Sequence, residues 1–196
     1  MKLGNIASIR SGLVLSRKKA RESSEMRYVL LNLRSINPDG YIDLEQTDVF
    51  DATERLNIDY LTQVGDIVVR LTAPYTAILI DETTQNMVVS SNFVIIRAER
   101  QEILPEYLVW LLNTSQIKRD IYENSSSNML SAIKAKYFSE LDIILPSMQE
   151  QKKIAMMNEL AKKESGLLRK LSHEKRRYYD LLIDRIYDEI KRGNEK

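Results

Sequence analysis

The sequence contains no cysteine, a single histidine, four prolines and six glycines in 196 residues. Without cysteine, disulfides and thiolate metal sites are excluded. The lone His173 lies in a charged stretch without an obvious partner, so we expect neither a histidine-based triad nor a metal cluster. No run reaches the roughly 20 apolar residues that span a membrane, and the first residues lack the apolar core of a signal peptide. We therefore expect a cytoplasmic protein without membrane contact.

Several motifs of catalysis are also missing. There is no G-x-x-x-x-G-K-[ST] and no G-x-G-x-x-G, so a nucleotide or S-adenosylmethionine pocket has no support. Residues 37–40 lack the second proline and the aromatic residue of an amino-methyltransferase motif, and a P-D…E-x-K nuclease site would need lysine in place of Thr47. The acidic pair Asp81-Glu82 is more simply explained as a solvated turn than as a pair of catalytic carboxylates. We predict a chain with no catalytic residue, no metal and no cofactor of its own.

What the sequence does contain is typical of a globular protein, with 43% hydrophobic and 29% charged residues. Its length suits one sizeable domain plus a long element. The net charge is only +1, but its distribution is uneven. Residues 1–34 hold eight basic and two acidic residues, residues 35–146 hold eight and seventeen, and residues 147–196 hold thirteen and nine. Because the middle of the chain is acidic, any surface that binds nucleic acid must be confined to a small basic part of the molecule.

Short apolar, β-branched runs separated by turn signals dominate residues 1–146. Residues 66–70 and 88–97 read as strands, residues 104–113 as a helix with Pro105 at its first position, and residues 51–57 as a short helix. Residues 28–34 and 41–44 read as two further strands around the Asn-Pro-Asp-Gly turn. The pattern predicts an α+β domain over residues 1–146, with a strongly bent or barrel-like, mixed or antiparallel sheet and short helices.

A long helix is predicted over residues 147–196. Ser147 and Glu150 form an S-x-x-E capping box just after Pro146, and about 45 residues follow without proline. Such a helix would extend roughly 70 Å, and a body of this size cannot cover its apolar stripe, so a partner helix in a coiled coil is expected. The predicted helix–helix seam consists of Ile154, Met157, Ala161, Leu168, Leu171, Tyr178, Leu182, Ile186 and Ile190.

Two polar segments of the body are candidates for contact with nucleic acid. Residues 17–21 hold four basic side chains, which form either a solvated loop or a clamp for phosphates. Residues 124–128 are either a flexible connector or a cluster of hydrogen-bonding groups near nucleic acid. If the body binds DNA, the residues predicted to contact it are Arg10, Arg17, Lys18, Lys19, Arg21, Arg34, Arg70, Thr72, Tyr75, Asn92, Ser125, Ser126, Ser127, Lys134 and Lys136. Of these, Arg70, Tyr75 and Asn92 are the candidates for contact with base edges.

The order of four short segments carries a resemblance to a known family. These are Leu-Gly-Asn-Ile-Ala at 3–7, Val-Gly-Asp-Ile-Val at 64–68, Leu-Pro-Glu-Tyr-Leu at 104–108, and Leu-Pro-Ser-Met-Gln-Glu-Gln-Lys-Lys-Ile at 145–154. Each is weak alone, but together the chain resembles the specificity subunits of type I restriction-modification systems, in a half-size form with one target recognition domain.

The resemblance implies a function for each predicted part. The domain of residues 1–146 would read one half of a split target in double-stranded DNA. The long helix would dock methyltransferase subunits, which supply S-adenosylmethionine and methylate adenine, and a restriction subunit would complete the complex. A full specificity subunit has two recognition domains, so this chain is a half-size subunit or a fragment. Two copies would then pair their helices antiparallel as a homodimer.

Two other interpretations stay open from the residues alone. One is a non-catalytic coiled-coil interaction module whose globular head binds protein, which suits the acidic middle of the chain. The other is a hydrolase with an unrecognised site. Binding to a split DNA sequence that falls steeply with salt would distinguish the specificity subunit from both.

Overall fold

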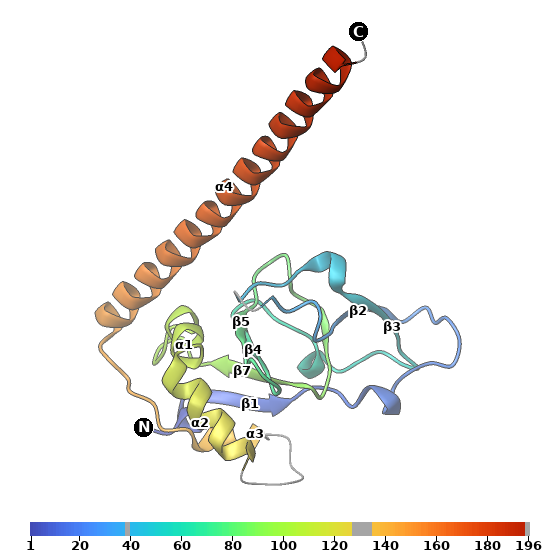
Figure 1. The fold of residues 1–196 in the computed structure, drawn as a ribbon. Coiled ribbons are helices and arrows are strands. Elements are labelled where there is room, and N and C mark those ends of the chain that lie inside the picture. The colour runs from blue at the N-terminus through green and yellow to red at the C-terminus, as the bar shows by residue number, and fades with distance from the viewer. Residues whose placement is uncertain (38–39, 127–134, 195–196) are drawn as a thin grey trace. The chain divides into compact units, whose positions relative to one another are not determined.

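A computed structural model describes residues 1–37, 40–126 and 135–194. The chain divides into two compact units, Met1–Ala155, which we call the body, and Met156–Lys196. The described residues of the body form two sheets, three α-helices and the beginning of the long helix α4 (Figure 1). The α+β architecture with a long carboxyl-terminal helix is as predicted.

The larger sheet has four antiparallel strands in the order β1-β7-β4-β5. These are β1 (Ala7–Ser11), β7 (Phe93–Ala98), β4 (Asp66–Arg70) and β5 (Ala77–Leu79). In the two central strands, β7 and β4, every residue before the last one or two is buried. This burial on both faces explains why their sequences are continuous apolar runs rather than alternating ones.

The smaller sheet has three strands in the order β3-β2-β6. Strand β2 (Arg27–Leu31) pairs antiparallel with β3 (Asp48–Asp51) and parallel with β6 (Val88–Val89). The mixed pairing agrees with the predicted mixed or antiparallel sheet, which is here divided into two.

The alternation of side chains along β4 shows how the layers pack. Ile67 and Val69 join a core cluster with residues of the three short helices, including Leu108 and Phe138. Val68, between them, joins a second cluster with residues of the smaller sheet. The four-stranded sheet therefore lies between a helical layer and the smaller sheet (Figure 1).

The helical layer consists of α1 (Pro105–Leu112), α2 (Ser115–Ser126) and α3 (Ala135–Glu140). Pro105 occupies the first turn of α1, where its missing N–H costs nothing. Helix α1 packs on β4 and β5, and α3 packs on β1 and the 3₁₀ turn η1 (Leu3–Asn5) before it. Three further 3₁₀ turns are η2 (Leu15–Arg17), η3 (Leu44–Gln46) and η4 (Ile58–Tyr60).

Three local predictions are wrong. Residues 51–57 form no helix; β3 ends there and a non-helical segment leads to η4, because Ala52 and Leu56 bury their side chains in a third cluster under the smaller sheet. Residues 41–44 form no strand: Ile42 makes an isolated bridge with Ile36, and Leu44 begins η3. Helix α2 continues to Ser126, into the segment expected to be a polar loop.

Helix α4 (Met148–Asn194) begins as the capping box predicts. The N–H of Ser147 donates to Oε2 of Glu150 at 2.9 Å, its hydroxyl donates to the same oxygen at 2.7 Å, and the N–H of Glu150 donates to Oγ of Ser147 at 3.4 Å. The predicted seam residue Ile154 packs against the core of the body.

The segment before α4 lies beside the amino terminus (Figure 1). The N–H of Ile143 donates to the Met1 carbonyl at 2.8 Å, the Met1 ammonium donates to the Ile143 carbonyl at 3.1 Å, and the N–H of Leu3 donates to the Leu141 carbonyl at 2.9 Å. The entry and the exit of the body are thus paired with each other.

Candidate nucleic-acid interface

Four of the predicted DNA-binding residues lie at one end of the four-stranded sheet. At this end β1 and β4 finish, and β7 and β5 begin. The N–H of Leu71 donates to the carbonyl of Asn92 at 3.0 Å, which joins the loop after β4 to the loop before β7. We call this end, with Arg70, Thr72, Tyr75 and Asn92, the sheet-end cluster.

The loop between β4 and β5 is an ordered turn. The N–H of Tyr75 donates to the carbonyl of Thr72 at 2.9 Å, and Tyr75 has a φ of 54°, in the left-handed region that side chains other than glycine seldom adopt. Thr72 is exposed and Tyr75 half-buried. Strained, non-glycine backbone conformations cluster at binding sites, so the turn is a candidate for contact with a ligand.

Arg70, the last residue of β4, has a defined side-chain position. Its Nε donates to Oγ1 of Thr72 at 2.9 Å, and its Nη1 makes a long hydrogen bond of 3.5 Å to the carbonyl of Leu33. Arg34, which follows Leu33 in the chain, is exposed and forms an ion pair of 2.7 Å with Asp48. The structure therefore brings Arg34 close to the sheet-end cluster.

The basic segment 17–21 is built onto the end of β3. The N–H of Thr53 donates to the carbonyl of Lys18 at 2.9 Å, Lys19 bridges to Ala52, and the Lys18 ammonium forms an ion pair with Glu54. Arg17, Lys19 and Arg21 are exposed. Arg55, which follows Glu54 in the chain, is exposed as well. It was not predicted as part of the basic segment, because no local sequence signal groups it with residues 17–21.

Arg10 belongs to an ion-pair network at the edge of the larger sheet. Its guanidinium pairs with Asp59, and this contact holds the pKa of the Asp59 carboxyl below its usual range. Asp59 also pairs with Arg97 at 3.2 Å, and Arg97 pairs with the buried Asp66 at 2.9 Å. Sequence reasoning missed this network, because no motif connects residues so far apart in the chain.

The remaining predicted residues lie elsewhere or outside the described chain. Lys136 is the second residue of α3, which packs on η1 and β1. Because Arg70 lies at the end where β1 finishes, Lys136 lies toward the opposite end of the larger sheet. Its ammonium is 3.5 Å from Glu140. Ser125 and Ser126 lie in the last turn of α2, and Ser127 and Lys134 are outside the described residues. The predicted set is thus not one continuous surface.

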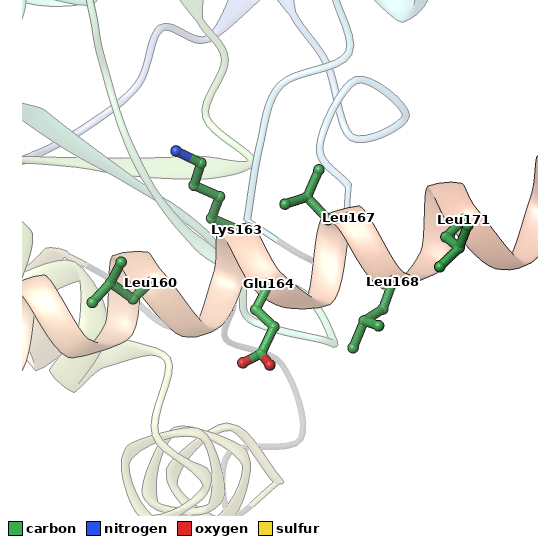
Figure 2. Close-up of a pocket in the computed structure, with 6 residues that line it drawn as sticks. All are labelled: Leu160, Lys163, Glu164, Leu167, Leu168 and Leu171. Atoms are coloured by element: carbon green, nitrogen blue, oxygen red, sulfur yellow. The ribbon is translucent and has the colours of Figure 1, made fainter.

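The second unit consists of helix α4 from Met156 onward, and its apolar side chains are exposed. Leu168 is 59% exposed, Leu171 52% and Tyr178 62%. Figure 2 shows a shallow hollow on this helix, lined by Leu160, Lys163, Glu164, Leu167, Leu168 and Leu171. The predicted seam residues that are exposed are Met157, Ala161, Leu168, Leu171, Tyr178, Leu182, Ile186 and Ile190. A second set of exposed apolar residues was not predicted: Met156, Leu160, Leu167, Tyr179, Leu181, Ile183 and Tyr187.

The described residues contain no group of three or more His, Cys, Asp or Glu side chains that could hold a metal ion. Within the same ranges, no helix is long and apolar enough to cross a membrane.

Comparison with known families identifies the chain. Residues 1–160 match the family model of the type I restriction modification DNA specificity domain. The chain belongs to this family. The match includes the body and the start of α4, so it confirms the resemblance drawn from the four short segments.

Solved structures share the fold of this specificity domain. The HsdS subunit from Thermoanaerobacter tengcongensis superimposes with a TM-score of 0.68 at 17% identity, over 93% of this chain and 46% of that one. A structure of a type I R-M system, described for its complex assembly and conformational transition, gives 0.66 at 17% identity with the same coverage. The S subunit from M. genitalium gives 0.51 at 16% identity, over 84% of this chain and 39% of that one.

This chain therefore spans less than half the length of the solved chains that it matches. A search of curated proteins finds no match to the sequence.

Proposed function

We propose that this chain is a DNA specificity subunit that reads one half of a bipartite target. The match of residues 1–160 to the specificity-domain family carries the proposal. Exposed basic residues at 17–21 and the sheet-end cluster support it as contacts to phosphate and to bases. The chain would contribute recognition rather than catalysis.

The long helix supports a role in assembly. Its exposed apolar residues would dock methyltransferase subunits, which would bind S-adenosylmethionine and transfer the methyl group to adenine. A restriction subunit could join the same complex. We further propose that two copies pair antiparallel through α4, which would place two recognition domains about a two-fold axis and so favour a symmetric split target.

The proposal is tested by co-purifying the full chain with the type I methyltransferase subunit of its own organism and mapping the methylated adenines. A discrete two-part methylated motif is expected, and its symmetry reports whether two copies of this chain read it. No complex and no methylation would contradict the proposal and favour the coiled-coil interaction module.

The basic segment provides a second, quantitative test. Replacing Arg17, Lys18 and Lys19 together by alanine should weaken DNA binding and flatten its salt dependence, because fewer counterions are released. Lys18 is paired with Glu54. We therefore expect the slope of log K against log salt to decrease by the equivalent of about two phosphate contacts rather than three. Binding measured between low and moderate salt gives the slope.

The matched control for this variant removes charge elsewhere. Arg100 and Arg119 are exposed cations outside residues 17–21, and their replacement by alanine should leave the slope unchanged. An unchanged slope in the triple variant would remove residues 17–21 from the DNA face.

A further inference from the structure

Arg70 differs from the other basic residues near the sheet end in what it contacts. Arg10, near the end of β1, and Arg34 each form an ion pair with a carboxylate. Arg70 has no such pair within the part of the chain that the structure describes; its partners are a hydroxyl and a carbonyl. Among the described residues, therefore, no carboxylate has to be displaced before the Arg70 guanidinium binds a ligand.

The two hydrogen bonds of Arg70 leave a defined set of donors. A guanidinium has five N–H groups. Nε–H is used by Thr72 and one hydrogen of Nη1 by the carbonyl of Leu33. One hydrogen on Nη1 and both on Nη2 remain, and two guanidinium N–H groups side by side match the O6 and N7 acceptors of guanine in the major groove.

The backbone of Arg70 is held as firmly as its side chain. Its N–H donates to the carbonyl of Thr76 at 3.0 Å, and it pairs with Phe93 in the antiparallel ladder of β4 and β7. The hydrogen bond from Leu71 to Asn92 continues this pairing beyond the strand. Reading a base edge requires such a fixed origin, whereas a phosphate can be met by a mobile side chain.

We propose that Arg70 reads a guanine in the half-site, and that Thr72 is its positioning residue. The proposal rests on the proposed function and adds the identity of one base pair to it. Thr72 would hold Nε so that the Nη1–Nη2 edge faces outward, with the Leu33 carbonyl as a second, weaker guide. The target half-site must then contain a G·C pair at one position whose recognition depends on Arg70.

The test uses the full chain in complex with its methyltransferase subunit and a randomised double-stranded DNA library. The wild type should enrich a motif with guanine at one position. Arg70→Ala should lose the preference at that position alone and keep the rest of the motif, which also shows that the variant is folded. Replacing that guanine with 7-deazaguanine removes the N7 acceptor, and it should weaken wild-type binding by roughly five- to 150-fold but not weaken Arg70→Ala further.

Thr72 is tested by a pair of variants. Thr72→Val keeps the shape but loses the hydroxyl, so it should reduce discrimination at the same position, and Thr72→Ser should restore it. A merely structural role of Thr72 would lower binding to all sequences equally. Arg100→Ala serves as the charge control, because Arg100 follows β7 at the opposite end of the sheet, and it should not alter the motif.

The outcomes separate this inference from the proposed function. If the wild type enriches no motif, the proposed function fails and the inference fails with it. If the wild type enriches a motif but Arg70→Ala lowers affinity uniformly and reduces the salt slope by about one, Arg70 is a phosphate contact and the inference is overturned while the proposed function stands. The inference is likewise overturned, and the proposed function stands, if no guanine preference in the motif depends on Arg70.

Discussion

At the scale of single residues, similar ion pairs have different consequences. Asp66 is 3% exposed and binds Arg97 through two oxygens, at 2.9 and 3.2 Å, while it also accepts the N–H of Gln63 at 2.9 Å. Lys2 and Asp142 form a shorter pair of 2.7 Å, but both side chains are largely exposed. Burial, not distance, decides which pair matters, because water screens the exposed one.

Replacing Asp66 by alanine should therefore lower the free energy of unfolding by about 3 kcal/mol, since Arg97 would lose its main partner in a mostly buried site. Denaturant titration of Asp66→Ala beside the wild type and Asp142→Ala measures this loss of stability. Asp142→Ala is the matched control and should leave the unfolding midpoint nearly unchanged. Equal effects of the two changes would contradict this account.

Ser147 and Glu150 give the start of α4 a pH dependence. The hydrogen bonds from Ser147 to the Glu150 carboxyl lower the pKa of that carboxyl. A group whose pKa is lower in the folded state stabilises the fold above its unfolded pKa, and that stabilisation is lost as the pH falls through the folded pKa. The cap is thus intact at neutral pH and weakens in acid.

Ser147→Ala should cost about 1 kcal/mol at neutral pH through loss of the cap, and it should move the pKa of Glu150 up toward its ordinary value. An NMR titration of the Glu150 side chain and denaturation at several pH values test both points. In Glu150→Gln the acid-induced loss from this group should disappear. A Glu150 pKa that does not rise in Ser147→Ala would refute the assignment.

At the scale of elements, one buried side chain joins α4 to α1. Gln151 is 1% exposed; its amide oxygen accepts the N–H of Leu104 at 2.8 Å, and its amide nitrogen donates to the carbonyls of Pro146 at 3.0 Å and Glu102 at 3.3 Å. These bonds satisfy backbone groups at the ends of two helices, where partners are otherwise missing. The first turns of α4 are consequently part of the body.

Gln151→Ala should lower the free energy of unfolding by about 1–3 kcal/mol, because it leaves buried polar backbone groups unsatisfied. The amide of Leu104 should exchange with solvent faster, which hydrogen exchange detects at that position. Gln149→Ala, two residues away and exposed, is the control and should change neither. Unaltered protection of Leu104 would show that Gln151 does not hold the joint.

Elements with local signals could be predicted from the sequence, and elements made by distant contacts could not. The β-branched run of β4, Pro105 at the start of α1 and the capping box of α4 are all read from neighbouring residues. Residues 51–57 resemble a helix locally, but Lys19 pairs with Ala52 and Leu56 is drawn into the core. Tertiary packing overrides helix propensity there.

The candidate site shows the same division. Arg70, Thr72 and Tyr75 could be grouped in advance because one loop carries them. The pairing of Arg10 with Asp59, or of Lys18 with Glu54, joins residues 49 and 36 positions apart, and only the folded chain reveals which cations are neutralised. The contact of Arg70 with the Leu33 carbonyl, across 37 positions, was equally hidden.

At the scale of the whole molecule, the exposed stripe of α4 predicts self-association. Leu168→Glu with Leu171→Glu should weaken it by at least about tenfold, since two apolar side chains per copy would become charged at the seam. Sedimentation equilibrium of the full chain without methyltransferase measures this. Arg169→Gln with Lys170→Gln changes the net charge by the same amount in the same turn of the helix, outside the predicted seam, and is the control. A wild type that is monomeric at all concentrations would contradict the proposed homodimer.

The pairing of residues 1–3 with residues 141–143 has a consequence for how such chains diverge. Everything between these two short stretches enters and leaves the fold at one place, beside the helix that follows. A recombination event that exchanged residues 4–140 between two genes would keep both flanking stretches and the helix unchanged. If the body reads DNA as proposed, such an exchange would transfer a new sequence preference in a single step, provided that the incoming segment keeps the backbone groups bonded by Gln151.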